Sequence, residues 1–347
     1  MAIEQRFGES SPLSIGVEEE VMLLDADTLA PVGAVRELLS ATDGIELPGT
    51  LKTELHASVV ELNTNICGSV VEAADSIRVL RTRTSEALRG LGLAMAAAGS
   101  HPFAEPEALP VTDEKRYEEM VGYAGVTARR QGVNGLHVHV GMPGSDECMR
   151  TLETILPWMP LVLALSANSP YLAGRAPGLA SNRAEILAQL PRSGAPPIFE
   201  SYEGWERWIE GFIATGLMKD YTQVWWDVRP HPRFGTLEIR MPDQPTGVDQ
   251  TEGFIDLLRN LCAWALDHPA TEVADRGIYQ QNRWAAARFG PDAELIHDGS
   301  LCTARELYDR LPFETSLDPT VSEAALQLRH GDPEAACADI VVRTWPW

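Results

Sequence analysis

The stretch GVEEEVMLLD, residues Gly16–Asp25, says more about the fold of this chain than any other. It has the valine, methionine and leucine content of a buried β-strand, yet three consecutive glutamates stand inside it. Because side chains alternate between the faces of a strand, Glu18 and Glu20 share one face and Glu19 lies on the other with the valines. Two carboxylates on one face repel each other unless cations lie between them, and Mg²⁺ prefers such oxygen ligands. The stretch therefore predicts a strand with a metal-binding face and a covered face, where Glu19 needs a partner such as an arginine from a helix.

Acidic side chains recur around the next predicted strand, VVELNT, residues 59–64. Glu61 lies there among β-branched neighbours, and Glu54 precedes it by seven residues. Residues seven apart on one continuous strand point to opposite faces, so the chain must bend between Glu54 and Glu61 if both side chains face one site. Taken alone, Glu61 is better explained as a charge that protects an edge strand from aggregation.

Two later segments alternate in the same way. His137 and His139 share one face of NGLHVHVGM, and Glu238 and Arg240 share one face of GTLEIRMPD, about 7 Å apart by strand geometry. Taken alone, the first pair fits buried, hydrogen-bonded histidines and the second fits a surface salt bridge. Four strands that each present acids or imidazoles on one face together predict a sheet whose concave face holds metal ions.

Several common site signatures are absent from the sequence. It contains no G-x-x-x-x-G-K-[ST] loop, no G-x-G-x-x-G after a strand and no G-x-S-x-G elbow. Zinc is disfavoured because neither H-E-x-x-H nor a cysteine cluster accompanies the histidines. A bound nucleotide would therefore have its phosphates held by metal ions and arginines rather than by a glycine-rich loop.

The composition is that of a globular protein, with 347 residues, 44% hydrophobic and 22% charged. A formal net charge of −22 argues against nucleic acid and anionic membrane as partners, because phosphate binding needs clustered Lys and Arg. The five cysteines show no C-x-x-C spacing, so we expect reduced, mostly buried thiols and a cytoplasmic protein. The polar start MAIEQRFGES does not resemble a signal peptide, and the apolar stretch Leu156–Ala167 is too short to span a bilayer.

Strands and helices do not alternate in a βαβ rhythm, which favours an α+β fold with a largely antiparallel sheet. Helices are expected at 71–98, 147–167 and 250–267, with two short ones after about 318. Residues 169–204, rich in Gly, Pro, Ser and Arg, predict a long loop around a short helix. No linker or repeat separates domains, so we expect a single domain over residues 1–347 that is mostly helical from about 249.

Five blocks follow one another along the chain: GVEEEVMLLDADTLAPV, ELHASVVELNT, NGLHVHVGMP, DVRPHPRFGTLEIRMPD and QQNRWAAARFG. Together they resemble the type 2 glutamate–cysteine ligase family of carboxylate–amine ligases, over residues 12 to 340. The resemblance implies a catalytic domain of the glutamine synthetase type. In that fold a curved, largely antiparallel sheet binds Mg–ATP on its concave face, and helices pack on its convex face. The resemblance also implies a homodimer.

Individual residues receive roles from the same resemblance. Arg240, with Glu238, would act in catalysis by stabilising charge on the transferring phosphoryl group. Arg183, in GLASNRAEI, either contacts the substrate carboxylate or phosphate or faces solvent. His139 is expected to support a metal ligand rather than to be one. Two or three Mg²⁺ ions around the ATP phosphates would be bound by Glu18, Glu20, Glu54, Glu61, His137 and Glu238. The nucleotide site would include Glu18, Arg240, Asn282, Arg283 and Arg288.

The implied reaction is an ATP-dependent ligation. ATP phosphorylates a carboxylate, and an amine attacks the acyl phosphate to give an amide, ADP and phosphate. Glutamate and cysteine are the family's named substrates, and small carboxylates and amines are therefore the expected partners. Asn134 and Asn182 stand where the family usually has a cysteine and often an aromatic residue, which leaves the substrates open. A phosphagen-type kinase, a metal-dependent amidohydrolase and a non-catalytic binding protein remain as alternatives.

Overall fold

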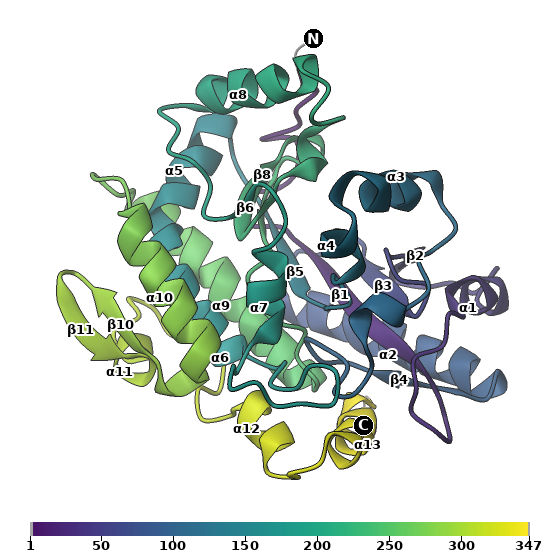
Figure 1. Cartoon of the computed structure of the whole chain (residues 1–347). Coiled ribbons are helices and arrows are strands. Elements are labelled where there is room, and N and C mark those ends of the chain that lie inside the picture. The colour runs from purple at the N-terminus through teal and green to yellow at the C-terminus, as the bar shows by residue number, and fades with distance from the viewer. Residues whose placement is uncertain (1–2, 346–347) are drawn as a thin grey trace.

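The computed structural model describes residues 3–345, and a seven-stranded sheet carries the acidic segments (Figure 1). Every pair of hydrogen-bonded neighbours in this sheet is antiparallel. The predicted α+β class with a largely antiparallel sheet is confirmed. The order across the sheet is β2 (Gly49–Thr53), β3 (Val59–Thr64), β1 (Ile15–Asp25), β5 (Leu136–Gly141), β9 (Thr236–Ile239) and β8 (Val228–His231), and β4 (Leu93–Ala96) pairs with the last part of β1.

Helices cover the face of the sheet that carries the apolar side chains. α2 (Val70–Gly90) packs on β3, α9 (Val248–Asp267) packs on β5, and α5 (Ser145–Ile155) packs on α9. Val17 and Val21 of β1 are fully buried in the core that results. Because one face of the sheet is closed in this way, the alternate side chains of each strand remain for a site on the other face.

A buried ion pair joins α2 to β1. Arg81 of α2 donates from Nε and Nη2 to the two carboxylate oxygens of Glu19, at 2.7 and 2.8 Å, and neither side chain is exposed. Gln244 and Thr251 also donate to Glu19 Oε1, at 3.0 and 2.6 Å. The predicted partner for Glu19, an arginine from a covering helix, is therefore confirmed. A charge pair held by this many hydrogen bonds fixes the helix to the strand.

The prediction of one helix over 71–98 is wrong at its C-terminal end. α2 ends at Gly90, and Gly92 adopts a left-handed conformation with φ of 72°, which the chain needs to turn back. Residues Leu93–Ala96 then form β4, paired with Met22–Asp25 of β1. The alanine-rich composition favours a helix here, but the unpaired backbone of β1 is satisfied only by another strand.

The apolar stretch after β5 lies in the interior. α5 continues through a single 3-10 turn into α6 (Met159–Ser166), so the predicted helix over 147–167 is confirmed with a break at its prolines. The combined segment Ser145–Ser166 has the length and composition of a helix that could cross a membrane. However, 83% of its most apolar 18-residue stretch is buried inside the molecule. Burial of this extent is that of a core helix.

The remaining elements lie mainly around the sheet and in the C-terminal part. The predicted long loop around a short helix is confirmed by α7 (Asn182–Leu187), and the helix over 250–267 is α9. A hairpin of β10 (Glu294–His297) and β11 (Ser300–Thr303) was not predicted. The five cysteines are free and buried, as predicted. The other elements are α1 (Val35–Ala41), α3 (Lys115–Ala124), α4 (Val126–Arg129), β6 (Ser193–Gly194), α8 (Tyr202–Ala214), β7 (Trp225–Trp226), α10 (Arg276–Phe289), α11 (Ala304–Tyr308), α12 (Glu323–Leu328) and α13 (Pro333–Thr344).

One hydrophobic core contains side chains from the sheet, such as Val138, and from the C-terminal helices, such as Leu258 and Ala286. The single domain over 1–347 stays a prediction.

Candidate active site

The register of the sheet brings the acidic and imidazole side chains together on its uncovered face. Glu18 lies opposite His137 on β5, and Glu20 lies opposite Glu61 on β3. His139 lies opposite Glu238 on β9. Directly opposed residues on antiparallel strands have Cβ atoms about 5 Å apart, so each pair can share a ligand. The side chains that the sequence predicts on one face of each of four strands therefore lie together in one site.

Three carboxylates form the first cluster. Oxygen atoms of Glu20, Glu54 and Glu61 all lie within 4.8 Å of one another. Glu54 directly follows β2, and the turn that leads into β3 supplies the bend that the parity of the two residues requires. Burial, more than any other factor, raises the pKa of Glu20, to about 7. Burial and then the charge of Glu61 raise the pKa of Glu54, and burial and Glu18 raise that of Glu61.

This cluster fits a divalent cation. Three carboxylates, buried or half-buried, whose oxygen atoms lie within 4.8 Å of one another resist ionisation, and a hard cation would restore the ionised form by binding all three. An oxygen-only ligand set of this kind suits Mg²⁺ better than zinc, whose sites in proteins usually include histidine nitrogen or cysteine sulfur.

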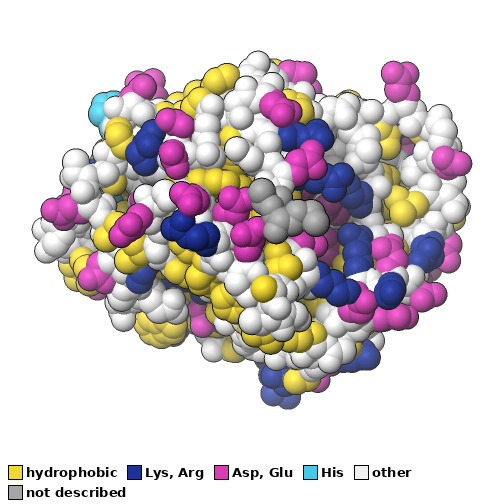
Figure 2. Space-filling model, turned by 90° about the horizontal axis from the view of Figure 1, so that it is seen from above, with side chains coloured by type: hydrophobic (Ala, Val, Ile, Leu, Met, Phe, Trp, Pro, Cys, Tyr) yellow, Lys and Arg dark blue, Asp and Glu magenta, His cyan; other side chains and the backbone are white. Residues whose placement is uncertain are grey.

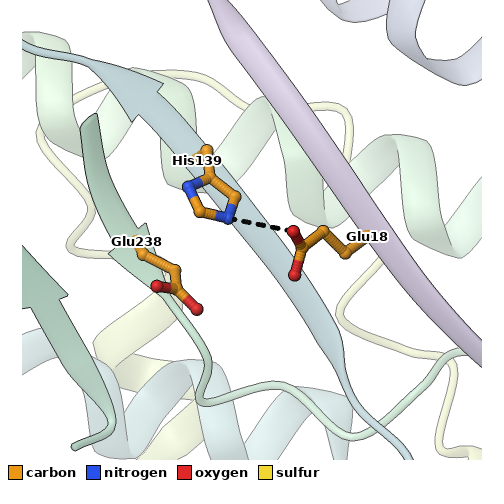
Figure 3. Close-up of side chains that lie close together, drawn as sticks. All are labelled: Glu18, His139 and Glu238. Atoms are coloured by element: carbon orange, nitrogen blue, oxygen red, sulfur yellow. Dashed lines mark ion pairs between the residues drawn. The ribbon is translucent and has the colours of Figure 1, made fainter. Parts of the chain in front are cut away.

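A second cluster consists of Glu18, His139 and Glu238, whose ligand atoms also lie within 4.8 Å of one another. Figure 3 shows the three side chains reaching from neighbouring strands toward a common space. His139 Nε2 is buried 3.5 Å from Glu18 Oε1 and makes no hydrogen bond within residues 3–345. Its Nδ1 is paired with Thr236 Oγ1 at 2.9 Å, which fixes the ring. A fixed imidazole nitrogen that faces two carboxylates also fits a cation.

His137 lies between the two clusters. Its Nδ1 is 3.1 Å from Glu18 Oε2 and its Nε2 is 3.8 Å from Glu20 Oε1. Burial and then the Arg240 guanidinium lower its pKa to about 4, so the ring is neutral and can serve as a ligand. The sequence predicts His137 as a ligand and His139 as support. The structure brings His139 itself into a cluster, and the part played by His137 stays a prediction.

Two arginines hold Glu238. Arg229 of β8 donates from Nε and Nη2 to its two oxygens, at 2.6 and 3.0 Å, and Arg240 donates from Nη1. Burial alone would raise the pKa of Glu238, but the charges of Arg229 and Arg240 outweigh it and hold the pKa well below its usual value. Arg240 Nε is buried without a hydrogen-bond partner in the described part of the chain. Glu238 is therefore ionised, and Arg240 retains a donor.

Two cavities adjoin this face and share Glu18, Lys52 and Phe234 in their walls. The first, of about 470 Å³, is also lined by Ser14, Asn63, Thr64, Ile66, His139 and Arg233. The second, of about 500 Å³, is lined by every glutamate of the two clusters except Glu238, together with Arg183, Arg229 and Arg240. Figure 2 shows Lys and Arg side chains gathered in the right-hand part of one face, with acidic side chains beside them. Arg183, Arg229 and Arg240 place three positive charges in the wall of the second cavity, where a polyanion could bind.

A model of glutamate–cysteine ligase family 2 matches residues 14–336. This chain belongs to that family. A protein of Rubrobacter xylanophilus, provisionally named glutamate–cysteine ligase 2-3, is 42% identical over 294 residues, 84% of this chain and 80% of the relative. Another of Herpetosiphon aurantiacus, provisionally named glutamate–cysteine ligase 2, is 34% identical over 292 residues, 83% of this chain and 76% of the relative.

Solved structures confirm the fold of this family 2 member. The glutamate–cysteine ligase of Francisella tularensis in complex with AMP superposes with a TM-score of 0.68 at 15% identity, over 99% of this chain and 89% of that one. A bifunctional glutathione synthetase from Pasteurella multocida gives a TM-score of 0.68 at 16% identity, over 96% of this chain and 52% of that one. The predicted glutamine synthetase-type ligase architecture is confirmed.

Arg183, the residue of the long loop that was expected at the site, lies in the wall of the second cavity. It is 3% exposed, so the alternative of a solvent-facing arginine is wrong. Its Nη2 donates to Arg240 O at 2.9 Å and its Nη1 to Met241 O at 3.1 Å. A Cβ atom on Gly135 would lie 2.0 Å from this guanidinium, so the glycine is needed beneath it. Contact of Arg183 with a substrate stays a prediction.

Three residues expected at the nucleotide site lie away from the two acidic clusters. Asn282 exchanges hydrogen bonds with the backbone of Ile296, and Arg283 is buried against Asp227. Arg288 borders a separate cavity beside Gly178. None of the three lines either cavity at the acidic clusters, among the residues described, and their assignment stays a prediction without geometric support.

Arg229 is the functional candidate that sequence reasoning missed. Arg229 lies on β8, in the proline-rich part of the block DVRPHPRFGTLEIRMPD, and the local sequence does not reveal that it lies opposite Glu238. The pairing of the hairpin strands could have identified Arg229. A hairpin that places Glu238 on the acidic face also places the directly opposed residue of β8 on that face.

Proposed function

We propose that this protein is an ATP-dependent carboxylate–amine ligase that forms an amide through an acyl phosphate. The observation that carries the proposal is the pair of clusters Glu20–Glu54–Glu61 and Glu18–His139–Glu238, set side by side on one sheet face with Arg240 next to them. Family 2 membership supports the same reaction class. Glutamate and cysteine, named for the relatives, are candidate substrates of this chain.

Mg²⁺ ions, one at each cluster, would supply charge neutralisation for the ATP phosphates. The chain's own residues position the reactants around them. Glu18 takes part in the wall of both cavities, so a phosphate chain that runs between the cavities passes its carboxylate. Arg229 fixes Glu238 in place, and the free Nε of Arg240 is available to a phosphoryl oxygen. This is the positioning and charge stabilisation that phosphoryl transfer requires.

The two cavities suggest how the substrates divide. The first offers exposed apolar surface at Ile66, which is 70% exposed, and hydroxyl groups at Ser14 and Thr64, a mixture that suits a nucleoside. The second, with its arginines, suits the carboxylate. The carboxylate oxygen attacks the γ-phosphorus of ATP and ADP leaves. The amine nitrogen then attacks the acyl carbon, and phosphate leaves with the electron pair of the broken C–O bond.

The test is ADP release from a matrix of carboxylates and amines with Mg²⁺, with mass spectrometry of the products. An amide formed in proportion to ADP supports the proposal. A stable phosphorylated guanidine would instead establish a kinase, and amide hydrolysis without ATP would establish an amidohydrolase. We also infer that the protein is cytoplasmic, forms a homodimer and binds neither nucleic acid nor membrane. Sedimentation at several protein concentrations tests whether it is a dimer.

A further inference from the structure

The second cavity has two walls of different chemistry. The sheet and the turn after β2 supply all of its carboxylates among the described lining residues. Further lining comes from α3, the segment before β5, α7 with the residues after it, and β7, and its charged members are Arg116 and Arg183. We call its apolar part the apolar wall, which consists of Met120, Val133, Leu187, Leu190 and Trp225. A substrate that reacts at the sheet must place its remaining atoms against this wall.

Helix geometry makes the apolar wall continuous with Arg183. Leu187 lies four residues after Arg183 on α7, so the two share one face of the helix. Tyr117 and Met120, three residues apart on α3, also share a face, and both line the cavity. A group placed beside Arg183 therefore continues onto Leu187.

Contacts between the segments hold the wall together. Gln131 Nε2 donates to Ile186 O at 3.0 Å, which ties the segment after α4 to α7. Pairing of β6 with β7 ties the chain after Leu190 to Trp225. The wall is thus a connected surface and not a set of separate loops.

Both arginines of this lining already have partners within the protein. Arg183 is engaged by two backbone carbonyls and lies 3.8 Å from Asp243, and Arg116 is engaged by Glu114 and the backbone of Thr53. Gln131 Oε1, in contrast, is buried and accepts no hydrogen bond from the described residues. The wall thus offers apolar surface and one neutral acceptor for an N–H donor.

We propose that the carboxylate substrate is an α-amino acid with an uncharged, apolar side chain. The side chain packs on the apolar wall, and the amino group donates to Gln131 Oε1. The inference rests on the proposed ligase function and narrows it, because it disfavours glutamate, whose second carboxylate would meet an apolar surface.

Hydroxylamine separates the choice of acid from the choice of amine. The acid's oxygen attacks the γ-phosphorus and ADP leaves, and the hydroxylamine nitrogen then displaces phosphate from the acyl carbon to give a hydroxamate. We expect kcat/KM for leucine and phenylalanine to exceed that for glutamate at least about tenfold. The kcat/KM for leucine should also exceed that for 4-methylpentanoate, which lacks the amino group. A preference for glutamate, or equal rates for leucine and 4-methylpentanoate, overturns the inference and leaves the ligase function intact. No ADP from any acid overturns the ligase function itself.

A matched pair of variants tests the wall directly. Met120→Glu places a carboxylate in the wall, whereas Gly122→Glu places one on the same helix where a Cβ meets nothing within 4 Å. We expect Met120→Glu to raise the KM for leucine about tenfold with little change in kcat, and Gly122→Glu to leave both unchanged. Equal effects in the two variants, or none from Met120→Glu, overturn the inference, and melting temperatures show that both fold.

Discussion

At the residue scale, Glu18 is the side chain on which the two clusters and the two cavities converge. It contacts His137 at 3.1 Å and His139 at 3.5 Å, and it lines both cavities. Glu18→Gln keeps the shape and a hydrogen-bond acceptor for the histidines but removes the charge. We expect ATP turnover to fall at least about a hundredfold, with a nearly unchanged melting temperature. Glu294→Gln, on the exposed surface of β10, is the matched control, and normal turnover in Glu18→Gln would show that the metal assignment is wrong.

Arg240 is the second residue whose chemistry is specific. Its guanidinium donates to Glu238 through Nη1 while Nε stays free. Arg240→Lys keeps the charge, but a single ammonium cannot serve Glu238 and a phosphoryl oxygen in the same planar arrangement. We expect kcat to fall about a hundredfold, with a smaller change in the KM for ATP. Arg150→Lys, in an exposed ion pair on α5, should change neither, and wild-type kcat in Arg240→Lys would remove Arg240 from catalysis.

The alternation of side chains between the two faces of a strand made much of the acidic face predictable from sequence. The alternation of side chains by itself separates Glu18 and Glu20 from Glu19, and the burial of each agrees. Arg229 was not predicted as a site residue, because its partner is set by the register between β8 and β9. A short strand beside a proline-rich turn does not reveal this register. For Arg283 the sequence likewise does not reveal its partner, Asp227, which lies 56 residues away along the chain and is bound by the Arg283 guanidinium in the interior.

At the scale of elements, the junction of α2 and β1 holds the acidic strand in place. Arg81→Met leaves Glu19 charged, buried and without its guanidinium partner, which should lower the free energy of unfolding by about 3–5 kcal/mol. Replacing Glu19 and Arg81 together by methionine should cost less than the single change, because no unpaired charge remains. Urea unfolding measures both. Arg83→Met, an exposed position on the same helix, is the control, and an equal loss there would show that helix propensity is the cause.

The elements that sequence missed share one physical cause. The end of α2 depends on Gly92 and on the need of β1 for a partner, and the hairpin of β10 and β11 depends on its packing against α10 and α11. Neither is encoded in the local pattern of polar and apolar residues, because tertiary contacts decide between helix and strand there. The strands of the sheet were predictable because burial on a single face leaves a period of two.

At the scale of the whole molecule, an acidic chain with a net charge of −22 has concentrated buried carboxylates where a cation can bind. Burial raises the pKa of Glu20 to about 7, and the pKa values of Glu54 and Glu61 are raised as well. Each group therefore holds its proton more tightly in the folded than in the unfolded state. These three carboxyls therefore contribute stability that is lost as the pH rises from about 4.5 through about 7, because the folded state keeps their protons in that window, whereas buried histidines such as His137, with its pKa lowered to about 4, contribute in the opposite sense.

Magnesium should reverse this loss, since it binds the ionised carboxylates and only the folded chain presents them together. At ten times its dissociation constant the ion adds about 1.4 kcal/mol to the free energy of unfolding, which corresponds to about 2 °C in melting temperature for a chain of this size. We expect that shift at pH 7.5 and little of it at pH 5.5, where protons compete. Glu61→Gln should reduce the shift at pH 7.5, whereas Glu46→Gln, at an exposed position outside the sheet, should not. A shift that is equal at both pH values, or unchanged in Glu61→Gln, would mean that magnesium binds elsewhere on the acidic surface.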